Sequence, residues 1–197
     1  MLEEEQIIVK RKTKYFYWYI IKNKRPQIIW GLLFYESMET SNLYLIYKQN
    51  PKICTDSRNI IQGSIFFALK GENFNGNIFA NKAIKKGCIK AIIDDEKYHN
   101  PPSTILVDNS LETLQDLARY HRDKLNIPVI GITGTNGKTT SKELINIVLQ
   151  KKYQTYCTKG NLNNHIGVPL SILELNSNHE IAIIEMGANH EKEINFL

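Results

Sequence analysis

The chain has 197 residues, a formal net charge of +5, and apolar and charged fractions of 42% and 23%. This length suffices for one large domain or two small ones with buried cores, and the composition excludes a disordered or fibrous protein. The charge is uneven, because residues 1–37 hold seven Lys or Arg against four Glu. The remainder is close to neutral, so the charge does not call for a nucleic-acid partner.

Cysteine usage and hydropathy indicate the compartment. Cys54, Cys88 and Cys157 are far apart and form no C-x-x-C pair, which argues against a zinc site and favours a reduced environment. Apolar runs near the start are too short to span a bilayer, and they do not follow the pattern of a signal peptide. We expect a cytoplasmic monomer without stable membrane insertion.

Residues 1–39 are predicted to be an extension of open role. They mix a basic run with the aromatic segment Tyr15-Phe16-Tyr17-Trp18-Tyr19. One interpretation is an arm that lies on an anionic membrane surface. The other, which we favour, is an extension without function, since Met38 would be a reasonable first residue.

Residues 40–126 have the pattern of a small mixed α/β domain. Apolar periodicity and turn-forming residues predict helices that begin near Thr40, Phe79 and Ser110, the last capped by Ser110. Apolar runs predict strands at 64–69, 89–93 and 104–107, with turns or loops at 71–77 and 94–103. A break at Asn126-Ile127-Pro128 indicates a domain boundary near residues 124–128.

The most informative stretch follows an apolar run at 127–132 and reads Gly131-Ile-Thr-Gly-Thr-Asn-Gly-Lys-Thr-Thr140. Strand, glycine-rich loop and helix in this order are typical of a phosphate-binding loop. Glycines let backbone N–H groups approach an anion, and the helix N-terminus adds partial positive charge. In the common G-x-x-x-x-G-K-[ST] pattern the first glycine would fall at Ile132, so the match is to a variant.

The loop predicts a nucleoside triphosphate site with a metal ion. Lys138 would reach the outer phosphates, and the Thr139 hydroxyl would complete the shell of a Mg²⁺ ion that bridges them. The nucleotide would lie over seven consecutive residues: Gly134, Thr135, Asn136, Gly137, Lys138, Thr139 and Thr140.

Residues 127–197 are predicted to begin a doubly wound α/β domain with a mainly parallel sheet. After the loop we expect a helix with Leu144, Ile147 and Val148 facing inward, a strand at 154–157, a helix at 168–175 and a buried strand at 181–186. Ligands bind at the carboxyl ends of such strands. Glu185 closes the last strand and is therefore a candidate Mg²⁺ ligand, or else a solvated glutamate.

Three further stretches carry a resemblance to a known family. They are Asp56-Ser57-Arg58 with Gly63-Ser-Ile-Phe-Phe-Ala-Leu-Lys-Gly71, then Gly160-Asn-Leu-Asn-Asn-His-Ile-Gly-Val-Pro169, then Glu185-Met-Gly-Ala-Asn189. With the loop at 133–140 they resemble the Mur ligases, ATP-dependent enzymes of peptidoglycan synthesis, and within them the members that add D-alanyl-D-alanine. The resemblance covers roughly residues 40–197.

The resemblance implies an activity and roles for particular residues. A carboxylate of UDP-MurNAc-tripeptide would attack ATP to give an acyl phosphate, and D-alanyl-D-alanine would then displace phosphate. Lys138 and His165 would act in catalysis, Ser57, Arg58 and Asn164 would bind the UDP-substrate, and Thr139 with Glu185 would hold Mg²⁺. For Ser57 and Arg58 an Asx-type turn with a surface salt bridge is the alternative.

These ligases continue beyond the point that corresponds to residue 197, so we expect a partial enzyme with little turnover. Two other interpretations stay open. One is a relative that forms another amide bond, such as folylpolyglutamate synthetase, although Thr139-Thr140 and the first domain argue against it. The other is a non-catalytic fragment that binds a nucleotide or a UDP-sugar.

Overall fold

The computed structural model describes residues 39–187. They lie in the compact unit Glu36–Leu197, and the chain's other unit, Met1–Tyr35, is outside the described residues. The membrane-arm hypothesis for residues 1–37 falls outside them too and stays a prediction. Among the residues that are described, no helix is long and apolar enough to cross a membrane.

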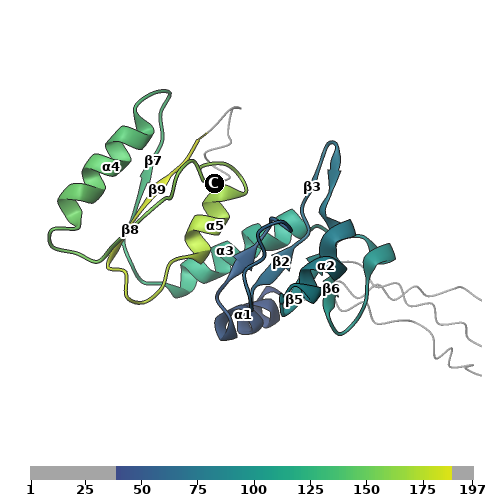
Figure 1. Ribbon diagram of the computed structural model, residues 1–197. Coiled ribbons are helices and arrows are strands. Elements are labelled where there is room, and N and C mark those ends of the chain that lie inside the picture. Colours follow the sequence, from purple (N-terminus) through teal and green to yellow (C-terminus); the bar gives the residue numbers. More distant parts are fainter. Residues whose placement is uncertain (1–38, 188–197) are drawn as a thin grey trace, which may run out of the picture. The chain divides into compact units, whose positions relative to one another are not determined.

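Within the described residues, one helix and four short strands come first, and strands and helices alternate from residue 80 onward (Figure 1). The elements are α1 (Thr40–Gln49), β1 (Ile53–Cys54), β2 (Ile65–Phe67), β3 (Lys70–Gly71), β4 (Phe74–Asn75), η1 (Gly76–Phe79), α2 (Ala80–Lys85), β5 (Lys90–Ile93), η2 (Glu96–Tyr98), β6 (Thr104–Leu106), α3 (Ser110–Lys124), β7 (Val129–Ile132), α4 (Lys138–Leu149), β8 (Thr155–Cys157), α5 (Gly167–Leu173) and β9 (Ile181–Glu185).

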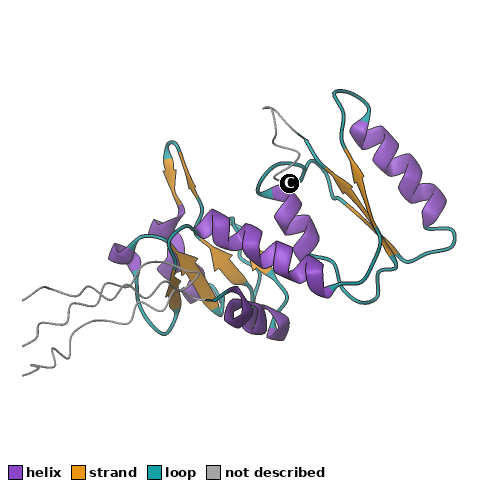
Figure 2. Cartoon of the chain, turned by 180° about the vertical axis from the view of Figure 1, so that it is seen from behind, coloured by secondary structure: helices purple, strands orange, loops and turns teal. Residues whose placement is uncertain are grey.

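The first sheet has the strand order β1-β2-β5-β6, and its pairs are parallel. Side chains alternate across it: Ile65, Phe67 and Ile92 pack with α1 and α3, whereas Phe66 and Ile93 pack with α2. Helices therefore cover both faces (Figure 2), as buried parallel strands require. The predicted turn at 71–77 is a short antiparallel hairpin, β3-β4, that continues into η1.

The start of α3 differs from the prediction by one residue. The cap is Asn109, whose Oδ1 accepts the N–H groups of Leu111 and Glu112. Ser110 is instead the first helical residue, and its N–H donates to Asp94 Oδ2. Asparagine and serine are both good caps, so composition alone does not separate two neighbours of this kind.

The second sheet has the order β7-β9-β8 and is parallel throughout. Its central strand β9 is buried from Ala182 to Glu185, as the continuous apolar run predicts. Helix α4 lies on one side of this sheet and α5 on the other (Figure 1). This arrangement confirms the predicted beginning of a doubly wound α/β domain.

The orientation of α4 about its axis was predicted wrongly. Leu144, Ile147 and Val148, expected to face inward, are 59%, 50% and 70% exposed. Instead Lys142 is fully buried, with the half-buried Ile145 on the next turn. The Lys142 ammonium finds acceptors beyond β8 and at the end of β9, so the polar side of this helix faces the sheet.

Helix α3 connects the cores on the two sheets. It contacts α1 and α5, and one apolar cluster runs from Leu43 in α1 through Leu117 in α3 to Leu173 in α5. The core is thus continuous across the boundary expected near residues 124–128. The division into a domain at 40–126 and a partial domain at 127–197 stays a prediction about the chain.

His121 of α3 lies at the centre of this contact and is buried. Its Nε2 is 2.9 Å from the carbonyl oxygen of Leu175, and its Nδ1 is 3.3 Å from Tyr44 Oη. A carbonyl only accepts, so the proton of the neutral ring lies on Nε2, and Nδ1 accepts from Tyr44. Burial lowers the pKa of His121, although the hydrogen bond to Leu175 opposes this in part.

We expect the free energy of unfolding to fall as the pH drops below about 6.5, because His121 binds a proton more readily in the unfolded chain than in the folded one. His121→Gln can still donate to the Leu175 carbonyl and should show a weaker dependence. Urea unfolding at about pH 7.5 and about pH 5.5 measures the difference. His179→Gln, outside this contact, should keep the wild-type slope, and equal slopes for wild type and His121→Gln would contradict the assignment.

Candidate nucleotide-binding site

The phosphate loop has the predicted order of strand, loop and helix. It connects β7 to α4, and residues 133–137 are exposed. Gly137 directly precedes α4 with φ +76°, a left-handed conformation that favours glycine. The N-terminal N–H groups of a twelve-residue helix therefore point toward the loop, where an anion would bind.

Lys138, the first residue of α4, folds back over this loop. Its Nζ donates to the carbonyl oxygens of Gly134 at 2.6 Å and Thr135 at 3.5 Å. The ammonium thus lies above the turn, where the outer phosphates of a nucleotide would be within its reach. Asn136 and Thr140 are also exposed at this end of the helix.

Glu185 and Thr139, the two predicted metal ligands, are brought together. In the pairing of β7 with β9, Ile132 is the partner of Glu185, so the loop begins beside this carboxylate. Thr139 Oγ1 donates a hydrogen bond to Glu185 Oε2 at 3.0 Å. Glu185 is only 1% exposed, which excludes the alternative of a solvated strand-end glutamate.

The oxygen donors at this point fit Mg²⁺. A hydroxyl and a carboxylate are hard ligands, and Mg²⁺ usually takes one or two such groups together with phosphate oxygens and water. Within residues 39–187 no cluster of three or more His, Cys, Asp or Glu could hold a metal ion by itself. Thr139 and Glu185 would supply two oxygen ligands of this kind.

Three groups that were not predicted to contact Glu185 surround it. Asn163 Nδ2 donates to Glu185 Oε1 at 2.8 Å, and Lys142 Nζ lies 3.7 Å from Oε2. Thr158 Oγ1 accepts the backbone N–H of Glu185 at 3.0 Å. Lys142 follows Thr139 by three positions and Lys138 by four, a helical spacing that places them on one side of α4 and was the available signal.

Asn164 has a structural contact in the loop after β8. Its Oδ1 accepts the N–H groups of Ile166 at 3.1 Å and Gly167 at 2.8 Å, so it caps the first turn of α5. Its predicted role in binding the UDP-substrate stays a prediction.

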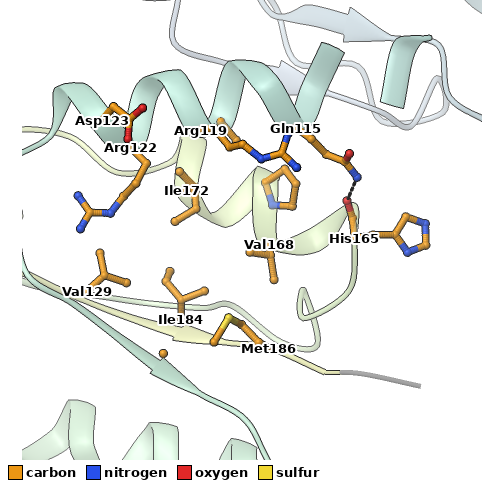
Figure 3. Close-up of a pocket in the computed structure, with 13 residues that line it drawn as sticks. Gln115, Arg119, Arg122, Asp123, Val129, His165, Val168, Ile172, Ile184 and Met186 are labelled. Carbon is orange, nitrogen blue, oxygen red and sulfur yellow. Dashed lines mark hydrogen bonds between the residues drawn. The ribbon is translucent and has the colours of Figure 1, made fainter. Parts of the chain in front are cut away.

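His165 lies beside a cavity of about 390 Å³ between α3, α5 and the strands β7 and β9 (Figure 3). Its carbonyl oxygen accepts from Gln115 Nε2 at 3.0 Å. Arg119 and Arg122 of α3 line the same cavity. Among the hydrogen bonds of residues 39–187, none joins His165 to Lys138, the two predicted catalytic residues.

Ser57 and Arg58 lie in a turn beyond the carboxyl end of β1. Asp56 Oδ1 accepts both the backbone N–H and the Nε–H of Arg58 at 2.9 Å, which forms an Asx-type turn and an exposed ion pair. Hydrogen bonds from the Arg58 side chain lower the pKa of Asp56 to about 2. The Asx-type turn with a surface salt bridge, which was the alternative for these residues, is therefore present. The substrate role of Ser57 and Arg58 stays a prediction.

Asp94 organises the neighbouring part of the same sheet edge, after β5. Its Oδ1 accepts from Asn77 Nδ2 at 2.8 Å and pairs with Lys70 Nζ at 2.9 Å. Burial alone would raise the pKa of Asp94, but the contacts with Lys70, Asn77 and the Ser110 N–H outweigh it and lower the pKa. Polar groups thus gather at the carboxyl edge of this parallel sheet, where ligands bind in α/β folds.

Known proteins resemble this chain in the same segments that form the site. Residues 132–197 match the Mur ligase middle domain, a match that begins at the last residue of β7 and includes the loop and Glu185. The chain belongs to the Mur ligase family.

Curated relatives carry the name UDP-N-acetylmuramoyl-tripeptide--D-alanyl-D-alanine ligase. The one from Bacillus subtilis (strain 168) is 44% identical over 148 residues, which is 74% of this chain and 32% of the relative. The one from Buchnera aphidicola subsp. Baizongia pistaciae (strain Bp) is 38% identical over 174 residues, which is 88% of this chain and 37% of the relative.

Solved structures agree with the sequence relatives. The MurF structure from Acinetobacter baumannii has a TM-score of 0.68 at 38% identity, covering 74% of this chain and 32% of that one. The MurF ligase from Thermotoga maritima in complex with ADP has a TM-score of 0.66 at 34% identity, covering 73% and 33%. The chain thus spans about a third of the length of the proteins it matches.

The contact between Thr139 and Glu185 predicts a specific loss of stability. Thr139→Val keeps the shape but leaves a buried carboxylate oxygen without its hydroxyl donor, so the free energy of unfolding should fall by about 1.5 kcal/mol or more. Thr139→Ser should restore most of it. Thr140→Val is the matched control on the next, exposed position. Urea unfolding measures all three, and equal losses for the two valine variants would refute the role of the hydrogen bond.

Proposed function

We propose that this chain forms the substrate-binding and nucleotide-binding part of a cytoplasmic ATP-dependent ligase, which joins D-alanyl-D-alanine to UDP-MurNAc-tripeptide. The observation that carries the proposal is the direct contact of Thr139 with the buried Glu185 at a phosphate loop. It occurs in a chain whose relatives at 38–44% identity bear the name of that ligase. Their names favour this amide bond over that formed by folylpolyglutamate synthetase.

The nucleotide would bind over residues 134–140. Exposed backbone N–H groups of the loop and of the first turn of α4 would donate to the phosphates, and Lys138 would exchange the Gly134 carbonyl for phosphate oxygens. Thr139 and Glu185 would hold Mg²⁺, which neutralises phosphate charge when it is bound.

The reaction takes place in two steps. A carboxylate oxygen of the tripeptide attacks the γ-phosphorus of ATP, the bond from this phosphorus to the β–γ bridging oxygen breaks, and ADP leaves. The amine of D-alanyl-D-alanine then attacks the acyl carbon, phosphate departs with the electrons of the carbon–oxygen bond, and the nitrogen loses a proton. The first step depends mainly on positioning and on charge neutralisation, which the loop and Lys138 would supply.

The UDP-substrate would extend from the carboxyl edge of the first sheet to the carboxyl edge of the second sheet. Ser57 and Arg58 follow β1 at the polar edge that also holds Asp94, a suitable place for the UDP end. His165 lines the cavity beside β7 and β9 together with Arg119 and Arg122, whose positive charge would suit the peptide carboxylate. Asn164, which caps α5, would position this loop next to the substrate.

Lys138 should matter most for the affinity for nucleotide. Lys138→Met removes the cation above the loop, and we expect the Kd for ADP to rise at least tenfold, since hydrogen bonds to charged groups contribute about 1.5–3 kcal/mol. Titration calorimetry in the presence of Mg²⁺ measures the change. Lys151→Met, an exposed lysine just after α4, is the control and should leave the Kd unchanged. An unchanged Kd for Lys138→Met would contradict the assignment of the loop.

Turnover tests the proposal against the non-catalytic alternative. We expect the chain by itself to bind ATP and UDP-MurNAc-tripeptide but to release little phosphate when D-alanyl-D-alanine is added. Phosphate release that requires both substrates would show a complete ligase and overturn this expectation. Failure to bind any nucleotide would overturn the proposed function itself.

A further inference from the structure

Lys142 is the only buried lysine among residues 39–187, and its side chain is fully shielded from solvent. Charged side chains are rarely buried without partners, because removal of an ammonium group from water is strongly unfavourable. A buried lysine in the second turn of the helix that carries a phosphate loop therefore calls for an explanation beyond packing.

The Lys142 ammonium has a partner on each side. Nζ donates to the carbonyl oxygen of Thr158 at 2.7 Å and lies 3.4 Å from that of Gly160. It also pairs with Glu143 Oε1 at 3.1 Å and lies 3.7 Å from Glu185 Oε2. An ammonium has three donors, and these acceptors occupy them, so Lys142 is not available to contact a phosphate itself.

These contacts connect three segments of the site: helix α4, the loop after β8 and the end of β9. Lys142 belongs to the helix after the phosphate loop, Thr158 and Gly160 begin the loop after β8, and Glu185 ends β9. Glu185 Oε2 faces both Lys142 and the Thr139 hydroxyl, while Oε1 faces Asn163. The direction of the carboxylate toward Thr139 is thus determined by neighbours on both sides.

We propose that Lys142, acting through Glu185, is a positioning residue for the metal–nucleotide complex. It holds the Glu185 carboxylate next to the Thr139 hydroxyl and ties the Thr158–Gly160 segment to α4, so that the two metal ligands are arranged before nucleotide arrives. The inference rests on the proposed function, because it assigns Lys142 a part in the same site.

The role predicts an effect on Mg²⁺-dependent binding in particular. For the wild-type chain, the Kd for ADP measured with EDTA divided by the Kd measured with Mg²⁺ gives the gain that the metal contributes. Lys142→Met fills similar space without charge, and this gain should fall about tenfold, as expected for the loss of an interaction with a charged group. Binding of ADP in EDTA should change less than threefold, because the loop and Lys138 are intact.

Two controls separate positioning from general destabilisation. Glu143→Gln removes the exposed partner of Lys142 and should leave the gain unchanged. In a Glu185→Gln background, Lys142→Met should cause no further loss, since a residue that acts through Glu185 has nothing left to position. Where the methionine variant is too unstable to purify, Lys142→Gln keeps a donor for the Thr158 carbonyl and should show the same reduced gain.

The outcomes are distinct. If the wild-type chain binds no ADP, the proposed function fails. If the wild-type chain shows the gain and Lys142→Met or Lys142→Gln retains it, Lys142 is only a structural residue and the inference is wrong. Additive losses for Lys142→Met and Glu185→Gln would also refute it, because they would show that the two residues act independently.

Discussion

The parallel pairing of β7 with β9 is the constraint on which the site depends. Because Ile132 is the partner of Glu185, one strand passes into the phosphate loop where the other presents its carboxylate. A shift of one residue in this pairing would turn Glu185 to the opposite face of the sheet, away from Thr139. The buried apolar residues of β9 hold this register, so the core of the domain also determines the geometry of the proposed metal ligands.

Polar contacts attach α4 to this sheet. Lys138, Lys142 and Asn146 recur at every fourth position. Lys138 donates to the Gly134 carbonyl in the phosphate loop and Lys142 to the Thr158 carbonyl after β8, whereas Asn146 Oδ1 accepts from the Thr155 hydroxyl in β8. Such directional contacts specify the rotation of the helix more sharply than apolar packing does. The contacts of Lys142 and Asn146 thereby also fix the direction of the N–H groups at the start of α4, which reduces the ordering that binding would require.

Much of the fold was readable from the sequence, because apolar runs and glycine or proline breaks alternate in the order of the elements. The phosphate loop and Glu185 could also be predicted, because the loop has a characteristic local spacing and Glu185 lies at the end of a predicted strand. The polar row on α4 was not: Lys142 is buried only because Thr158, Gly160 and Glu185 meet it in three dimensions. The position of His165 beside α3 likewise depends on a contact with Gln115, fifty positions earlier in the chain.

The outer side of helix α4 affects the solubility of the chain. Leu144, Ile147 and Val148 form an apolar stripe that is exposed to solvent in the described part of the chain. Stripes of this kind adhere to one another, more strongly in sulfate or phosphate buffers that favour burial of apolar surface. The solubility of the isolated chain, rather than its fold, should then limit the concentrations it reaches, and a charged residue in place of Val148 would raise that limit without touching the site.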